Sequence, residues 1–263
     1  MKSHPTVKEQ DPAVAQAILR LVFVCLVIAS LAALPARAGD KKDKEKSAPL
    51  QAIDSGSFGI FIKGQRVATE SFTIHQQDAT STIQSELKQE HGPATQKPDL
   101  VITSSGQILR YEWSQGTDGS LTVLPNNEFL IEKITSATFT KPAEQSFLMP
   151  NTSVILDNNF FVHREVLAWR YLASDCKQDG GGFKCQRVPG DFGVLVPQDR
   201  TSLHIRMELV GAEKVSIRGS ERELLRLNLK GDNVDWALWV DDHDQFKLMK
   251  VAIPADSTEV VRD

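Results

Sequence analysis

The segment FGIFIKGQRVATESFTI at residues 58–74 decides the fold class of this chain. Apolar and polar residues alternate on both sides of Lys63-Gly64, as expected for two strands that each bury one face. Gly64 supplies the positive φ that a tight hairpin turn requires. The segment therefore predicts an antiparallel hairpin.

The same period of two continues along the chain, with turn residues roughly every eight to twelve positions, which is typical of antiparallel sheets. Leu225, Leu227 and Leu229 alternate with polar residues and so share one sheet face. Further strands are expected at 80–87, 100–103, 108–113, 121–124, 129–140, 203–209, 234–240 and 246–253. The pattern predicts a mostly β protein built as a meander.

One segment, residues 157–172, has helical rather than strand periodicity. Asp157 is placed to cap the first turn, and Phe160, Leu167 and Tyr171 fall on one stripe at helical spacing. A helix with so wide an apolar face has to be laid against or inside a curved sheet.

The N-terminus has the pattern of a secretory signal peptide. The apolar run 21–34 is shorter than the about 20 residues of a membrane span and fits the about 7 to 15 of a signal core. Ala36 and Ala38 follow Pro35 in the small-x-small pattern of a cleavage site, so we expect cleavage after Ala38. An uncleaved anchor is the alternative. We predict a signal peptide at 1–38, a charged linker at 39–51 and one β-rich domain at 52–263.

Cysteine usage agrees with export to the periplasm or the extracellular space. Cys25 leaves with the signal, and Cys176 and Cys185 flank a glycine-rich turn. In an oxidising compartment such a close pair predicts a structural disulfide.

No catalytic, cofactor or metal motif is recognisable. The cluster Asp241-Asp242-His243-Asp244 is interpreted as a hairpin turn, because adjacent side chains point in different directions. The other histidines are scattered, which disfavours a histidine-based zinc enzyme. A formal net charge of −4 disfavours a nucleic-acid footprint. We therefore predict no cofactor, no metal and no nucleic-acid partner, and we favour a non-catalytic protein. An enzyme is a further alternative, which would need perturbed titratable groups that converge in a cleft.

The opening hairpin at 58–74, together with WALWVDD at 236–242 and KLMKVAIP at 247–254, resembles uncharacterised bacterial periplasmic proteins of the β-clam type. These are distant structural relatives of the lipoprotein carriers LolA and LolB. The resemblance implies a strongly curved antiparallel sheet of about ten strands, a β-clam or half-barrel, whose concave face is plugged by the helix at 157–172. It also implies an acyl ligand in the concavity.

These observations favour an exported, non-catalytic protein that binds a lipophilic or cell-envelope ligand. The alternative is an envelope structural or protein-interaction module with a solid core, which would show an exposed apolar patch or an unpaired strand edge. Expected partners are a lipid or an envelope protein, membrane contact occurs only through the signal segment before cleavage, and the oligomeric state is left open. The expected apolar cavity lining is Phe160, Leu167, Trp169, Tyr171, Leu225, Leu227, Leu229 and Trp236.

Overall fold

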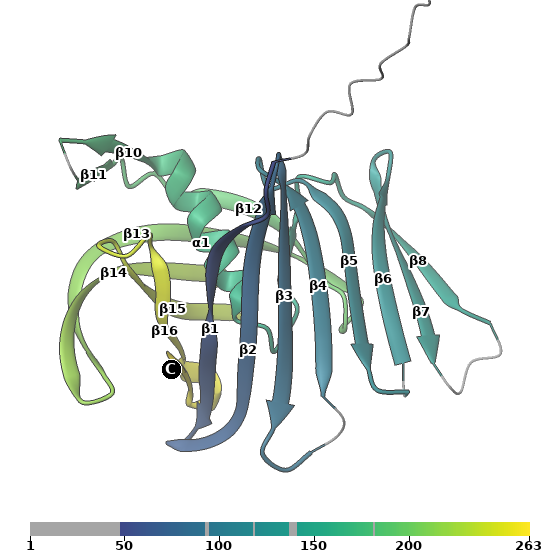
Figure 1. Cartoon of the computed structure of the whole chain (residues 1–263), viewed down its shortest axis with the longest axis horizontal. Helices are drawn as coiled ribbons and strands as arrows, with labels where there is room; N and C mark the ends of the chain where they lie inside the picture. Colours follow the sequence, from purple (N-terminus) through teal and green to yellow (C-terminus); the bar gives the residue numbers. More distant parts are fainter. Residues whose placement is uncertain (1–47, 93–94, 118, 137–140, 181) are drawn as a thin grey trace, which may run out of the picture. The chain divides into compact units, whose positions relative to one another are not determined.

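The computed structural model describes residues 48–92, 95–117, 119–136, 141–180 and 182–263 (Figure 1). The chain divides into two compact units, Met1–Glu45 and Lys46–Asp263, and all described residues belong to the second. The predicted signal peptide at 1–38, its predicted cleavage site and most of the predicted linker lie outside the described residues. The first strand begins at Gln51, which the sequence had placed at the end of the linker.

The second unit is mostly β with one α-helix. The large sheet contains β1 Gln51–Ile62, β2 Gln65–Gln77, β3 Thr80–Gln89, β4 Gln96–Thr103, β5 Ile108–Gln115, β6 Gly119–Asn126, β7 Phe129–Ser136, β8 Ala143–Leu148, β9 Val154–Ile155, β12 Gly190–Val196, β13 Thr201–Ile217, β14 Ser220–Gly231, β15 Val234–Asp241, β16 Lys247–Ile253 and β17 Thr258–Arg262. The helix is α1 Val162–Asp175, a 3₁₀ turn η1 spans Pro254–Asp256, and a separate hairpin pairs β10 Cys176–Asp179 with β11 Gly182–Cys185.

The large sheet is a meander of fifteen strands in the order β8-β7-β6-β5-β4-β3-β2-β1-β17-β16-β15-β14-β13-β12-β9. Neighbouring strands are antiparallel throughout except for the short parallel pair of β9 and β12. The sheet is open, with β8 and β9 at its edges. The expected sheet of about ten strands was therefore too small. The additional strands β8, β9, β12 and β17 are short, polar or interrupted by glycine, so they carry little periodic signal.

The predicted opening hairpin is confirmed. β1 and β2 pair antiparallel and are joined at Lys63 and Gly64, which have φ of 50° and 80°. Two successive positive φ values match the right-handed twist of the flanking strands, and glycine adopts such a value without steric cost.

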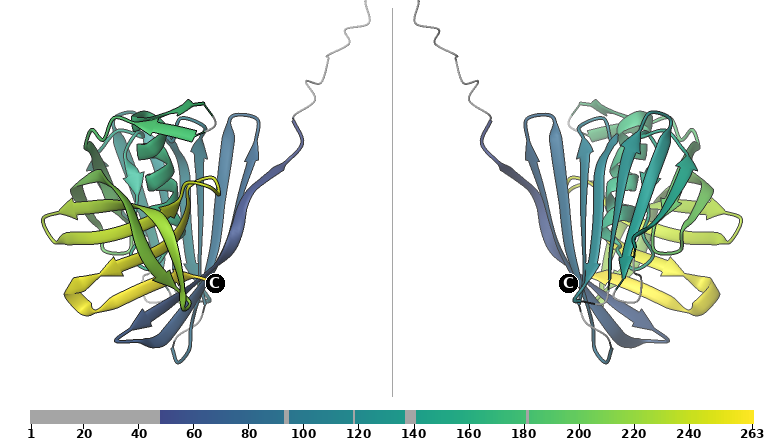
Figure 2. Two further views of the ribbon diagram at one scale, coloured as in Figure 1. Left: turned by 90° about the vertical axis from the view of Figure 1, so that its left-hand side faces the viewer. Right: turned by 90° about the vertical axis from the view of Figure 1, so that its right-hand side faces the viewer.

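The sheet bends so that β13–β16 turn across the direction of β1–β8, and α1 lies between these two groups of strands (Figures 1 and 2). Hydrogen bonds reach the helix from both groups: Val162 of α1 donates to Glu70 of β2, and Leu248 of β16 donates to Glu165 of α1. A bulge at Leu209/Gly211 interrupts the β13–β14 register, and such bulges bend a strand locally. The helix therefore lies on the concave side of the sheet.

The expected helix at 157–172 is present, but it begins at Val162 and ends at Asp175. Asp157 does not cap it: the residue at the N-cap position is Phe161, whose side chain makes no capping hydrogen bond. Asp157 instead accepts hydrogen bonds from the Tyr111 hydroxyl and, over 3.2 Å, from the N–H of Gln198. Residues distant in sequence therefore bind the Asp157 side chain, which the local pattern had assigned to the helix N-cap.

The main core fills the space between α1 and the concave face. Phe160, Leu167 and Tyr171 are buried in it together with Leu227 and Leu229 of β14. A smaller apolar cluster, composed of Ile217, Leu224, Ala237, Trp239 and Met249, forms separately from this core. Among the described residues, no helix is both long and apolar enough to cross a membrane.

Candidate functional site

A cleft of about 650 Å³ runs along one side of α1. We call it the helix cleft. Its walls come from α1, from the β4–β5 turn and from β9 and β12, and they are mainly apolar. The apolar lining residues are Leu100, Ile102, Ile108, Val154, Ile155, Val166, Leu167, Trp169, Ala173 and Phe192. The volume falls within the roughly 300–1,000 Å³ of small-molecule sites.

The helix lines this cleft with a single stripe of side chains. Apart from Trp169, the helical residues that line it recur three or four positions apart and therefore project from one face of α1. They are His163, Val166, Leu167, Arg170, Ala173 and Ser174. The stripe begins with the polar His163, continues with apolar residues, and becomes polar again at Arg170 and Ser174.

His163 lies at the inner end of the stripe and is 1% exposed. Neither imidazole nitrogen has a hydrogen-bond partner among the described residues. The ring packs instead against Tyr111 and Phe160, with centroids 5.8 and 5.9 Å away. Burial, with a smaller contribution from the charge of Arg164, lowers the pKa of His163 to about 3. The imidazole is therefore neutral at physiological pH and presents one donor and one acceptor.

Arg170 lies two helical turns further along and is half-buried. Its Nη1 donates to the carbonyl of Gly106 over 3.3 Å, and its guanidinium carbon lies 5.7 Å from the centre of the Phe192 ring. Burial lowers the pKa of Arg170, and no carboxylate among the described residues forms an ion pair with it. The wall of the helix cleft thus carries a positive charge without an ion-pair partner among the described residues.

The eight residues predicted to line a cavity are not brought together in one. Leu167 and Trp169 line the helix cleft, and the indole Nε1 of Trp169 donates to the carbonyl of Phe246 over 2.9 Å. Trp236 lines a second cleft, of about 480 Å³, with Phe161. The remaining five residues pack in or against the main core: Phe160, Tyr171, Leu225, Leu227 and Leu229.

Tyr171 shows why an apolar stripe is a poor guide to a cavity. Its hydroxyl donates to the carbonyl of Val188 over 3.1 Å and accepts the N–H of Leu209 over 3.0 Å. The ring is 1% exposed. Tyr171 therefore connects α1 to β13 and is not available to a ligand.

The sequence interpretation missed four buried titratable groups that connect the helix to the sheet. Arg262 of β17 donates to Asp54 of β1 over 2.7 Å and to Glu165 of α1 over 3.1 Å. Glu70 of β2 accepts the N–H of Phe161. The sequence does contain a signal for Glu70. In the alternating pattern of β2 it lies on the same face as the buried Ala68 and Phe72.

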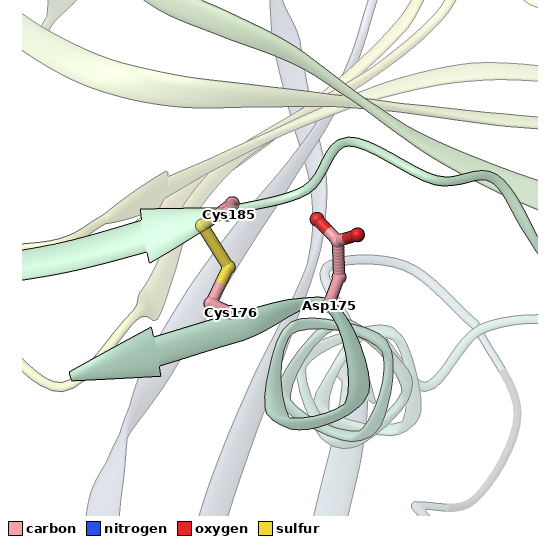
Figure 3. Close-up of side chains that lie close together, drawn as sticks. All are labelled: Asp175, Cys176 and Cys185. Carbon is pink, nitrogen blue, oxygen red and sulfur yellow. A yellow bond between two sulfur atoms is a disulfide. The ribbon is translucent and has the colours of Figure 1, made fainter.

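The disulfide between Cys176 and Cys185 is present, as predicted, and it joins directly opposed residues of the β10–β11 hairpin (Figure 3). Asp175, the last residue of α1, directs its carboxylate at the chain that follows Cys185 and accepts the N–H groups of Arg187 and Val188, each over 2.9 Å. The three side chains lie close together, but both sulfurs are engaged in the disulfide bond. The group therefore anchors the hairpin.

The Asp241–His243 cluster lies where β15 turns into β16, as expected. Asp241 is buried and is held by Arg222 over 2.6 Å, whereas His243 is exposed. Oδ1 of Asp241 accepts the backbone N–H of His243 over 3.1 Å. These contacts account for the cluster as turn structure.

Comparisons of the chain with protein-family models, with curated proteins and with solved structures found no match. The argument for function therefore depends on the geometry of the site.

Proposed function

We propose that this protein is an exported, non-catalytic binding protein that holds a small apolar or amphiphilic ligand in the helix cleft. The observation that carries the proposal is His163, which is buried without a hydrogen-bond partner among the described residues, in the wall of a mainly apolar cleft. Buried polar side chains are nearly always hydrogen-bonded, and burying one without a partner costs free energy. A ligand with a polar atom at this depth would supply the missing bond.

The rest of the cleft suits a flexible apolar ligand. Val166 and Leu167 of α1 face Leu100 and Ile102 of β4 across it. Each methylene that such walls remove from water contributes about 0.8 kcal/mol. An alkyl chain would therefore gain binding free energy along the cleft, whereas a strongly polar ligand would not.

Export is part of the proposal. The disulfide is compatible with an oxidising compartment. The signal segment lies outside the described residues, and N-terminal sequencing of the exported protein tests it. We expect Gly39 as the first residue, and a mature chain beginning at Met1 would mean that residues 21–34 act as an anchor.

Ligand binding is tested by titrating the purified exported protein with dodecanol in a calorimeter. Val166 is half-buried and lines the helix cleft, so Val166→Trp should fill it and abolish the binding heat. Val210→Trp is the matched control, because Val210 is 46% exposed and does not line the cleft. Binding that survives Val166→Trp, or no binding by the wild type, would contradict the proposal. Native mass spectrometry of protein purified from its own envelope would then identify the natural ligand.

One observation favours the alternative of a protein-interaction module. β8 is an edge strand of the sheet, and its Leu148 is 72% exposed beside its register partner Phe129, which is 41% exposed. An unpaired apolar edge is a template for adding a strand from a second chain. If two copies pair here, Leu148→Lys should shift the sedimentation coefficient from that of a dimer to that of a monomer. A wild type that sediments as a monomer at high concentration would exclude this pairing.

A further inference from the structure

We propose that the helix cleft selects ligands with an acidic head group, and that Arg170 pairs with that group. The inference rests on the proposed function, because it names the ligand class for the same cleft. The ligand would be an anionic amphiphile, with a carboxylate at Arg170 and an alkyl chain that extends along α1 and carries a polar atom where it reaches His163.

The first argument is charge. Arg170 is half-buried in the cleft wall, yet no Asp or Glu among the described residues forms an ion pair with it. By contrast, the buried Arg262 has two carboxylate partners. Charges withdrawn from water are normally paired, because the free energy lost on desolvation has to be offset by a partner of opposite charge. An anionic ligand would provide the compensation that the protein lacks at Arg170.

The second argument is the position in which the guanidinium is held. Its one hydrogen bond among the described residues goes to Gly106 at the β4–β5 turn, and Phe192 lies 5.7 Å away on the other wall. A Cβ at Gly106 would lie only 3.1 Å from the Arg170 Cδ, so glycine provides the room for this placement. Guanidinium has five N–H donors in a planar fork. One bond to Gly106 leaves donors for a carboxylate.

The third argument is the polarity of the two ends of the cleft. Near Arg170, the β4–β5 turn contributes Ser104 and Ser105, which are exposed, so a head group there would remain hydrated. Further in, Val166 and Leu167 are apolar. His163 is seven residues from Arg170, which corresponds to about 10 Å along a helix. An amphiphile therefore fits with its acid outside and its chain inside.

One acidic side chain, Asp191, also lines the cleft. It is exposed to solvent, and it lies 4.0 Å from Arg206 and 3.9 Å from His204. Because water and Arg206 screen its charge, Asp191 does not cancel the attraction of Arg170 for an anion.

The test compares two ligands of equal chain length, dodecanoate and dodecanol, by calorimetric titration of the exported protein at pH 7.5. A hydrogen-bonded ion pair predicts dodecanoate affinity about ten- to a hundredfold above that of dodecanol. Arg170→Gln should lower dodecanoate affinity to about that of dodecanol, and Arg170→Lys should restore part of the difference. Arg110→Gln is the matched control, since Arg110 is 42% exposed in its side chain and does not line the cleft.

The outcomes separate the two proposals. Equal affinity for both ligands, with no effect of Arg170→Gln, would overturn the acidic-head inference and leave the binding function intact. A loss of affinity for both ligands in Arg170→Gln would also overturn it, because Arg170 would then act through packing. Failure of the wild type to bind either ligand would overturn the proposed function itself. Urea unfolding of each variant verifies that a lost affinity does not reflect a lost fold.

Discussion

Oε2 of Glu70 on β2 accepts a hydrogen bond from the backbone N–H of Phe161, 2.6 Å away, at the start of α1. The other carboxylate oxygen accepts the N–H of Val162 over 3.4 Å. The first N–H groups of a helix have no intrahelical partner, so an acceptor placed there satisfies them. A strand residue 91 positions earlier in the chain thus performs the capping that the helix's own N-cap residue does not.

Replacing Glu70 should therefore destabilise the junction between α1 and the sheet. Glu70→Ala leaves two buried N–H groups without an acceptor and should lower the free energy of unfolding by about 1–3 kcal/mol. Glu70→Gln keeps one acceptor oxygen and should lose less than half as much. Urea unfolding at pH 6 measures both variants. Equal losses for the two would mean that packing, and not hydrogen bonding, accounts for the effect.

The buried ion cluster of Asp54, Glu165 and Arg262 provides the second attachment of the helix. Side-chain exposures of 3%, 0% and 9% place all three away from solvent. Arg262→Met leaves two carboxylates facing each other and should cost about 3–5 kcal/mol of unfolding free energy. Adding Asp54→Asn and Glu165→Gln to Arg262→Met should recover most of that loss, because no buried charge remains.

The matched control for Arg262 is Arg218→Met. Arg218 also pairs with a carboxylate, that of Asp263 at 2.8 Å, but its side chain is 54% exposed. Exposed ion pairs contribute about 0–1 kcal/mol, so this variant should unfold almost as the wild type does. Similar losses for Arg218→Met and Arg262→Met would contradict the importance of burial.

The sequence predicted the strands well wherever one face is buried and the other is not. The segments 203–209 and 225–229, in which apolar and polar residues alternate, lie within β13 and β14 as expected. Such alternation is a direct signal because every second side chain of a strand points to the core. It failed for β9, which has two residues, and for β17, a five-residue strand in which the polar Thr258 and Arg262 occupy buried positions. A two-residue bridge is too short to show a period, and polar residues at buried positions hide the apolar alternation.

The candidate site was less predictable than the fold. The apolar stripe of Phe160, Leu167 and Tyr171 indicated burial correctly, but burial in a packed core and burial along a cleft give the same pattern. Among the described residues, His163 has no hydrogen-bond partner and Arg170 has no ion-pair partner. Only the tertiary structure reveals that such a partner is missing. Glu70 could have been recognised, because a glutamate on the buried phase of a strand requires a partner.

Leu167 belongs to both the core and the wall of the helix cleft, and it is completely buried. Leu167→Ala should lower the free energy of unfolding by about 2–5 kcal/mol, the range for truncations that leave a cavity. Leu109→Ala, at a site 40% exposed, is the control and should change it by less than about 0.5 kcal/mol. Chemical denaturation measures both. If Leu167→Ala also proves neutral, α1 packs less tightly in solution than the structure shows.

Because of His163, the free energy of unfolding should fall in acid, and the substitution His163→Phe should reveal this contribution. Burial lowers the pKa of His163 to about 3, whereas an unfolded histidine titrates near about 6.5. A lowered pKa means that the folded state excludes the proton. Its contribution to stability is therefore complete above pH 6.5 and is lost progressively as the pH falls toward 3.

Other groups titrate in the opposite direction and must be separated from His163. Burial raises the pKa values of Glu70 and Glu132 to about 7, so their contribution is present below about pH 4.5 and is lost as the pH rises through 7. His163→Phe leaves these carboxyl groups in place and keeps a ring against Tyr111 and Phe160. The difference in unfolding free energy between wild type and His163→Phe therefore isolates the histidine.

We expect the variant to be at least as stable as the wild type at pH 7.5, because it buries no unpartnered nitrogen. Between pH 6 and pH 4 the wild type should lose stability relative to the variant by up to about 1.4 kcal/mol per pH unit, the slope for one proton. Urea unfolding at half-unit pH steps gives this difference curve. A difference that stays constant with pH would show that His163 is hydrated in solution. The polar end of the helix cleft would then be open to water, and the unpartnered imidazole would no longer argue for a ligand.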